Sequence, residues 1–434
     1  MKHSIHINKT KDNAEVLFVN VPGSSSYYFN TICNAGYNYA DKERYELPHL
    51  LEHLAFEGSK NYPKPGDMSY ELEKLGGWYN AMTSEQNIRY FLVGSIKDYH
   101  KITELGLEQY TSPLFNEDNI VEQKEVVERE FKRQIDNDGE KVRALTYTKL
   151  FPDKLSFAKD RIATLKNITK KDIESYYKKT HTRANTTFVI AGDLPEKKRS
   201  EILSLIEAKI TALPIGTRFN KINDLGADYG KIVQSLPSKL EGQLHFSITF
   251  IKPDYETDIN YRAACVVAKA VYNRGDSSRI FRKSRAKGLA YTVNSGIYNG
   301  HDYSEMYVID KTDPHLASDL FKLCLDELLD LRAGNITDEE LVRAKGFMAG
   351  GYDTDIETSR DLADWYGPIF VDKEPLNAPE EFAKAIRKVT KADVISVMNK
   401  FVKKDNWLIS LVGHGAKSYE KDFGKIINSS ISKI

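Results

Sequence analysis

Apolar positions along the chain recur with two different periods, which predict strands early in each half and helices after them. Short runs rich in β-branched and aromatic residues predict strands in the first half at 15–21, 27–34, 78–83 and 88–93. Helical periodicity predicts helices at 45–58, 68–75, 98–110, 117–134 and 171–180. The second half is similar, with strands near 243–250, 290–297 and 303–308 before long helices. Because strands cluster instead of alternating with helices, the pattern favours an α+β fold with mainly antiparallel sheets packed against helices.

Two segments of the chain match without a gap at an offset of 221 residues, the distance from Thr169 to Thr390. Each begins with Thr-x-x-Asp, which is typical of a capped helix start with an acidic residue in its first turn. Each ends in a β-branched run before a glycine, Gly192 or Gly413, which indicates a short buried strand. The alternative is two unrelated helix–strand units. A fixed spacing with the same caps favours a duplication.

A duplication of this length predicts two homologous domains, which also suits a chain of 434 residues. After a helical run, the stretch that begins at Leu213 is punctuated by Pro, Gly and Asn, as linkers often are. We therefore predict an N-terminal domain over 1–215, a linker over 216–230 and a C-terminal domain over 231–434.

Charge and cysteine content exclude several classes of function. The chain has 62 Lys+Arg and 62 Asp+Glu, so it lacks the basic footprint of a nucleic-acid or anionic-membrane protein. Its three cysteines lie far apart in sequence, which implies no disulfide framework and favours a reducing compartment. No signal-peptide core and no long apolar run is present. These features predict a cytoplasmic protein without nucleic-acid or membrane partners.

The sequence His49-Leu-Leu-Glu52-His53 is the strongest candidate for chemistry. On a helix, His49 and His53 lie about 40° apart, and Glu52 lies about 60° to the other side of His49. The leucines of the same helix fall on the opposite side: Leu47, Leu50, Leu51 and Leu54. Two His at i and i+4 can bind one zinc ion, and the Glu is placed to act on a water as general base. The alternative is a helix with two solvated His and an ordinary Glu.

A catalytic zinc site needs a third protein ligand. The predicted helix over 117–134 offers several carboxylates, and most acidic runs are only a solvated face. Glu130 is different because it projects between Val126 and Val127, on the arc with the apolar stripe, where a carboxylate needs a partner. Glu125 and Glu128 lie on the far arc. The pattern predicts Glu130 as the third ligand, and places Gln123 two turns earlier on the same stripe.

With these residues the chain resembles the zinc metallopeptidase family of pitrilysin, insulin-degrading enzyme and the mitochondrial processing peptidases. That family has an inverted His-x-x-Glu-His motif and a Glu ligand about 76 residues beyond the second His. Here 76 residues separate His53 from Glu130. The resemblance implies two homologous α+β domains that form a clam-like half chamber. It also implies one Zn²⁺ per chain, held by His49, His53 and Glu130, with Glu52 as general base.

Two further stretches are similar to family segments. Gly76-Gly-Trp-Tyr-Asn80-Ala81-Met-Thr83 matches Gly-Gly-x-x-Asn-Ala-x-Thr, which implies that Asn80 and Ala81 lie on an edge strand that pairs with the substrate backbone. The segment 278–291 is similar to a second-domain segment whose Arg and Tyr bind substrate carbonyls or the oxyanion. This implies roles for Arg285 and Tyr291.

The chain departs from the family pattern in two places. Arg285 and Tyr291 are six residues apart, one fewer than is usual, so Arg282 is an alternative to Arg285. Gln123 stands where many active relatives have a Glu beside the metal ligands, and its presence implies lower activity or a changed pH dependence.

Together these features predict a zinc-dependent endopeptidase that hydrolyses peptides or unfolded polypeptide segments. Because the zinc residues and the Arg/Tyr segment occur in one chain, we expect a self-sufficient homodimer, with a heterodimer with a related subunit as the alternative. Two other hypotheses stay open at this point. The chain could be a catalytically weak or inactive peptide-binding or scaffold relative, or a catalytic subunit that needs an unrelated partner chain.

Overall fold

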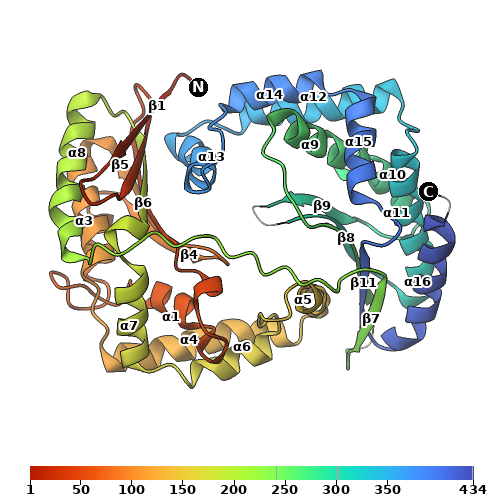
Figure 1. The fold of residues 1–434 in the computed structure, drawn as a ribbon, viewed down its shortest axis with the longest axis horizontal. Helices are drawn as coiled ribbons and strands as arrows, with labels where there is room; N and C mark the ends of the chain where they lie inside the picture. Colours follow the sequence, from red (N-terminus) through yellow and green to blue (C-terminus); the bar gives the residue numbers. More distant parts are fainter. Residues whose placement is uncertain (241, 301–302, 433) are drawn as a thin grey trace. The chain divides into compact units, whose positions relative to one another are not determined.

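The computed structural model describes residues 1–240, 242–300, 303–432 and 434, which divide into two compact units (Figure 1). The first unit contains residues 1–132, 158–222 and 356–376. The second contains residues 133–157, 223–355 and 377–434. Each unit therefore includes a segment from the other half of the sequence, which the prediction of two continuous domains did not include. Among the described helices, none has the length and apolar character needed to cross a membrane.

The first unit is built on a mixed sheet with the strand order β1-β2-β6-β3-β5-β4 in its described residues. Strand β6 runs parallel to β2 and antiparallel to β3, which places it in the middle of the sheet. The strands are β1 (Ser4–Lys9), β2 (Glu15–Asn20), β3 (Ser26–Cys33), β4 (Trp78–Thr83), β5 (Ile88–Ser95) and β6 (Thr186–Gly192). The helices are α1 (Leu47–Leu54), α2 (Asp67–Glu73), α3 (Tyr99–Thr111), α4 (Glu117–Ile135), α6 (Ala158–Leu165), α7 (Lys170–Thr180), α8 (Glu196–Lys209) and α13 (Ser359–Val371).

Helices cover both faces of this first sheet. Because side chains alternate along a strand, Phe29 and Phe188 point into the core shared with α1, α3 and α7. Their neighbours Tyr28 and Val189 point to the other face, where they pack against α13. This second face is buried by residues that lie far along the chain, beyond position 355.

The second unit has the strand order β7-β11-β8-β10-β9 in its described residues. Strand β11 runs parallel to β7 and antiparallel to β8. The strands are β7 (Ile232–Pro237), β8 (Leu244–Lys252), β9 (Asn294–Asn299), β10 (Ser304–Thr312) and β11 (Trp407–Gly413). The helices are α5 (Asp138–Leu150), α9 (Ile259–Asn273), α10 (Arg279–Ala286), α11 (Ala317–Arg332), α12 (Asp338–Thr354), α14 (Pro379–Lys388), α15 (Lys391–Phe401) and α16 (Ala416–Ile431). The predicted α+β class, with two homologous sheets packed against helices, is confirmed.

The duplication is visible in single hydrogen bonds. Thr169 and Thr390 both form a capping box at the start of their helices, α7 and α15. At the ends of these helices, the Asn185 side-chain amide donates to the carbonyl of Thr180 (2.8 Å), and the equivalent Asn406 donates to the carbonyl of Phe401 (2.7 Å). The same local sequence therefore closes the helix–strand connection in the same way in both units.

Helices α5 and α13 are equivalent in the repeat, but each packs on the sheet of the other half. In the second unit, the Thr146 hydroxyl of α5 bonds to the hydroxyls of Ser247 and Ser410 (2.8 and 2.9 Å). In the first unit, Gly367 of α13 takes the place of Thr146 and packs on Val189, the equivalent of Ser410. The two halves thus exchange one helix (Figure 1, α5 in gold and α13 in blue).

Several predicted elements differ from the observed ones. The helix predicted over 45–58 ends at Leu54, before a turn in which Gly58 has a φ of +132°, a value that favours glycine. The strand predicted over 290–297 begins only at Asn294, because the chain first leaves α10 through a turn at Gly288 (φ +64°). The edge strands β1 and β7 were not predicted; neither contains a buried residue, so neither has a set of apolar positions that faces a core.

Candidate metal centre

The orientation of α1 follows from its leucines. Leu47, Leu50, Leu51 and Leu54 are buried in the core of the first unit. Pro48 lies in the first helical turn, where a missing N–H costs nothing. With this face fixed, the imidazoles of His49 and His53 lie on the other side and are mostly buried, with side-chain exposures of 16% and 17%. The predicted separation of the helix into an aliphatic and a polar face is observed.

Helix α4 brings Glu130 to these two imidazoles. The Nε2 atoms of His49 and His53 are 3.2 Å apart. A carboxylate oxygen of Glu130 lies 3.5 Å from Nε2 of His49 and 3.8 Å from Nε2 of His53. Among the residues that the structure describes, this is the one group of His, Cys, Asp and Glu whose atoms could share a metal ion.

The exposed fraction of its side chain does not distinguish Glu130 from its neighbours. The expectation that Glu130 is set apart as a carboxylate on the buried, apolar side of the helix was therefore wrong. Its side chain is 43% exposed, whereas that of Glu128 is 38% exposed. The difference lies in their partners. Glu128 bonds to Lys132 (2.8 Å) and Glu125 lies near Arg129 (3.5 Å), while the carboxylate of Glu130 faces the two imidazoles. The hydrogen bond from Lys132 lowers the pKa of Glu128.

The outer nitrogens of both imidazoles have hydrogen-bond acceptors. His49 Nδ1 lies 3.2 Å from a carboxylate oxygen of Glu46. His53 Nδ1 lies 3.1 Å from Oε1 of Gln123, whose own NH₂ group donates to Glu57 (2.7 Å). Since both partners accept, the ring protons belong on the Nδ1 atoms. The pKa of Glu57 is raised mainly by burial and, less strongly, by the charge of Glu122.

This arrangement leaves three lone-pair donors facing one another: the Nε2 atoms of His49 and His53, and the carboxylate of Glu130. Without a cation between them, such groups repel. Ligand atoms about 2.0–2.1 Å from one zinc ion at tetrahedral angles lie about 3.3 Å apart. The observed separations of 3.2, 3.5 and 3.8 Å lie close to that value. Two neutral imidazoles and one carboxylate are also a ligand set of catalytic zinc sites, so the residues present fit the metal.

Glu52 faces the strand that was predicted to pair with substrate. The Thr83 hydroxyl, at the end of β4, donates to a carboxylate oxygen of Glu52 (2.5 Å). In the part of the chain that the structure describes, β4 is the last strand of the first sheet, so one of its backbone edges has no sheet partner there. On this strand Ala81 pairs with Tyr90 of β5, and its N–H also contacts the side-chain oxygen of the exposed Asn80 (2.9 Å).

Sequence reasoning missed Glu46 and Arg161. Glu46 is fully buried immediately before α1, and the guanidinium of Arg161 on α6 donates to it. Burial disfavours the charge of Arg161, but its interactions with Glu46, Tyr37 and Tyr45 together outweigh burial and raise the pKa of Arg161. The position of Glu46, three residues before His49, was a usable signal, because residues at i and i+3 share a helix face. No local signal connects Arg161 to the site.

The predicted substrate residues of the C-terminal half lie in the second unit. The guanidinium of Arg285 is 4.7 Å from the centre of the Tyr291 ring, which is 74% exposed. Arg282 is also exposed and lies one turn earlier on α10. The pKa of Arg343 is lowered mainly by burial and, less strongly, by the charge of Arg282. Of Arg282 and Arg285, the latter is therefore the one that the described structure places against the Tyr291 ring.

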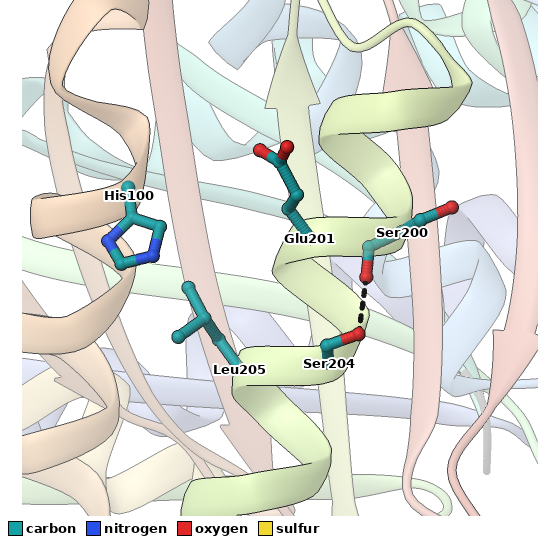
Figure 2. Close-up of a pocket in the computed structure, with 5 residues that line it drawn as sticks. All are labelled: His100, Ser200, Glu201, Ser204 and Leu205. Atoms are coloured by element: carbon teal, nitrogen blue, oxygen red, sulfur yellow. Dashed lines mark hydrogen bonds between the residues drawn. The ribbon is translucent and has the colours of Figure 1, made fainter.

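A separate surface depression lies between α3 and α8 in the first unit (Figure 2). It is lined by His100, Ser200, Glu201, Ser204 and Leu205. The Ser204 hydroxyl bonds to the backbone of its own helix (2.9 Å), and Glu201 accepts a hydrogen bond from Tyr99. None of the lining residues belongs to α1, α4 or β4, so the depression is not part of the metal centre.

Two family models match most of the chain. Residues 16–156 match "Insulinase (Peptidase family M16)", and residues 167–347 match "Peptidase M16 inactive domain". The chain belongs to the M16 peptidase family. The first of these segments includes all three candidate metal ligands and Glu52, whereas the second begins after them.

Relatives of this family align with almost the whole chain. An uncharacterized zinc protease of Rickettsia felis is 25% identical over 409 residues, which cover 92% of this chain and 95% of the relative. The mitochondrial-processing peptidase subunit beta of Saccharomyces cerevisiae is 23% identical and aligns with 92% of this chain and 88% of its own. A protease structure from Helicobacter pylori has the same fold, with a TM-score of 0.83, 19% identity, and coverage of 95% of this chain and 100% of that chain.

Proposed function

We propose that this M16 family member is a zinc-dependent endopeptidase that hydrolyses peptides or unfolded polypeptide segments. His49, His53 and Glu130 would hold one zinc ion, and Glu52 would be the general base. The observation that carries the proposal is the convergence of the Nε2 atoms of His49 and His53 with the carboxylate of Glu130, on and beside the helix that carries Glu52. The names of the relatives support it, since several are zinc proteases.

When bound, zinc would supply Lewis-acid activation of the scissile carbonyl and of the attacking water. The residues of the chain would handle the proton and the substrate. Glu52 would take a proton from the attacking water and return it to the leaving amine. The hydrogen bond from Thr83 goes to one oxygen of Glu52, and the other oxygen would make this transfer. The free edge of β4 would bind the substrate backbone as an added strand, and Arg285 with Tyr291 would bind substrate carbonyls.

A scaffold without turnover is the main rival hypothesis, and two observations oppose it. Gln123 occupies the position of the usual carboxylate but still accepts from His53, and it is itself held by Glu57. The matched "inactive domain" model covers residues 167–347 and so excludes α1 and Glu130. Metal analysis of the purified protein, together with cleavage of a mixed peptide library, tests the proposal. Stoichiometric zinc without any cleavage would support the scaffold.

The assembly state belongs to the same proposal. We propose a cytoplasmic homodimer that needs no other chain, although one relative is by its name a subunit of a processing peptidase. Size-exclusion chromatography of the protein alone, followed by the cleavage assay on each fraction, tests this. Activity that appears only after another chain is added would exclude self-sufficiency.

Glu130→Gln should lower zinc affinity by more than the roughly 10–100-fold that is typical of changes outside the ligand shell. The amide removes an anionic ligand and leaves two imidazoles with an under-neutralised dication. Glu128→Gln is the matched control on the same helix, and it should leave zinc affinity unchanged because Glu128 bonds to Lys132. Competition with a fluorescent zinc chelator measures both. If Glu128→Gln lost zinc and Glu130→Gln did not, the ligand assignment would be wrong.

Arg285→Ala and Tyr291→Phe should each slow peptide cleavage while bound zinc stays at the wild-type level, because neither residue is a proposed ligand. Arg282→Ala is the control, since it removes a neighbouring arginine of α10 and leaves the contact between Arg285 and Tyr291 in place. Turnover of a fluorogenic peptide and zinc content, measured on the same preparations, decide between the two arginines. A large effect of Arg282→Ala with a silent Arg285→Ala would reverse the assignment.

A further inference from the structure

Glu46 is a buried carboxylate that carries two hydrogen bonds, one on each oxygen. It is 0% exposed, and an ionised group in that position needs strong partners. One oxygen faces His49 Nδ1 at 3.2 Å, and the other accepts from the Nε–H of Arg161. Its backbone N–H also points to the hydroxyl of Thr164 (3.3 Å). The carboxylate therefore has little freedom to turn away from the imidazole.

Arg161 is itself held in place by aromatic rings. Its guanidinium lies 4.5 Å from the ring centre of Tyr37 and 4.6 Å from that of Phe131. Phe131 is on α4, one residue after Glu130, and its ring meets the His49 ring edge to face at 5.8 Å. Stacking of this kind restricts a guanidinium to one direction of hydrogen bonding. The fixed arginine in turn fixes the carboxylate of Glu46.

The second imidazole has a different kind of partner. His53 Nδ1 faces a neutral amide, Gln123, whereas His49 Nδ1 faces an anion that is paired with a cation. A carboxylate that accepts from a metal-binding imidazole fixes its tautomer and raises its strength as a ligand. The two imidazoles are thus oriented by unlike groups, and the stronger one acts on His49.

We propose that Glu46, held by Arg161, is the positioning residue of the first metal-binding imidazole: it keeps the proton on His49 Nδ1 and so presents the Nε2 lone pair to zinc. The inference rests on the proposed zinc site and deepens it. It assigns a role to a fully buried carboxylate and to an arginine that lies 115 residues away in the chain.

We expect the substitution Glu46→Gln to change the direction of the hydrogen bond at His49 Nδ1. An amide has one accepting oxygen, whereas two donors, Arg161 and His49, compete for it. Since Arg161 can only donate, it takes the oxygen, and the NH₂ group of the amide then faces His49 Nδ1. His49 must accept there, so its proton moves to Nε2 and blocks the lone pair. In the double variant Glu46→Gln/Arg161→Met, the competitor is gone and the amide oxygen can accept from His49 again.

The test compares the unchanged protein, Glu46→Gln, the double variant and the control Glu43→Gln, which alters an exposed glutamate three residues away. Long-range ¹H–¹⁵N spectra of metal-free protein labelled with ¹⁵N-histidine give the tautomer of His49, assigned by its loss in His49→Gln. Chelator competition gives zinc affinity, and thermal melting confirms that each variant is folded.

We expect Glu46→Gln to move the His49 proton to Nε2 and to lower zinc affinity about 10–100-fold. The double variant should recover the Nδ1–H tautomer and most of the affinity, a rescue that general damage to the fold would not produce. Unchanged tautomer and affinity in Glu46→Gln would overturn the inference, and so would a double variant that is no better than the single one. If the unchanged protein bound no zinc, the proposed function would fail, while the tautomer spectra would still decide the role of Glu46.

Discussion

Glu52→Gln is expected to abolish nearly all peptide hydrolysis while zinc content stays near that of the unchanged protein. The amide has the same size as the carboxylate, but it cannot take a proton from water, and positioned proton transfer contributes about 10²–10⁴-fold to a rate. Zinc should remain because the proposed ligands are His49, His53 and Glu130. Initial rates with a fluorogenic peptide at saturating zinc, together with metal analysis, measure both quantities.

Thr83→Val is the informative companion to this variant. It removes the hydroxyl that orients Glu52 but leaves the carboxylate in place, so its effect on turnover should be clearly smaller than that of Glu52→Gln. More than a tenth of wild-type turnover in Glu52→Gln would show that another group acts as the base. A larger effect of Thr83→Val than of Glu52→Gln would show that β4 matters for a reason other than orienting Glu52.

Leu362→Asp, a change in the C-terminal half of the sequence, is expected to open the sheet of the N-terminal half. Leu362 is 0% exposed on α13, among Val189, Tyr28 and other residues of the first unit. A carboxylate placed there is buried without a partner, one of the changes that cost more than about 4 kcal/mol. Hydrogen exchange followed by mass spectrometry should show loss of protection in β2 and β6, and lost zinc binding should accompany it.

Leu362→Met is the matched control, because it keeps the volume and apolar character of the site and so should cost less than about 1.5 kcal/mol. Strands β8 and β11 of the second unit should keep more of their protection than β2 and β6 in Leu362→Asp. Loss of protection confined to β8 and β11 would contradict the assignment of residues 356–376 to the first unit.

Much of the local structure followed from short-range patterns. The i, i+4 histidines, the intervening Glu52 and the opposite leucines determined the two faces of α1, since helical geometry fixes these angles whatever surrounds the helix. The paired Thr-x-x-Asp sequences determined where α7 and α15 begin, because a capping box needs only its own four residues. The α+β class and the duplication followed from the same kind of information.

Contacts between distant parts of the chain could be found only in the tertiary structure. Glu130 has an exposure similar to that of Glu128, and its distinction comes from facing the imidazoles of another helix. Helices α5 and α13 occupy equivalent positions in the repeat, and nothing in either local pattern says which sheet each will cover. Glu46 lies only three residues before His49 in the sequence, but its burial and its bond to Arg161 depend on how α6 packs. The sequence by itself therefore predicted many of the elements and the candidate ligands His49, His53 and Glu130. The tertiary structure showed that the Glu130 carboxylate faces both imidazoles, which side chains contact those rings and which helix closes each sheet, because periodicity describes one element at a time and these contacts depend on packing between elements.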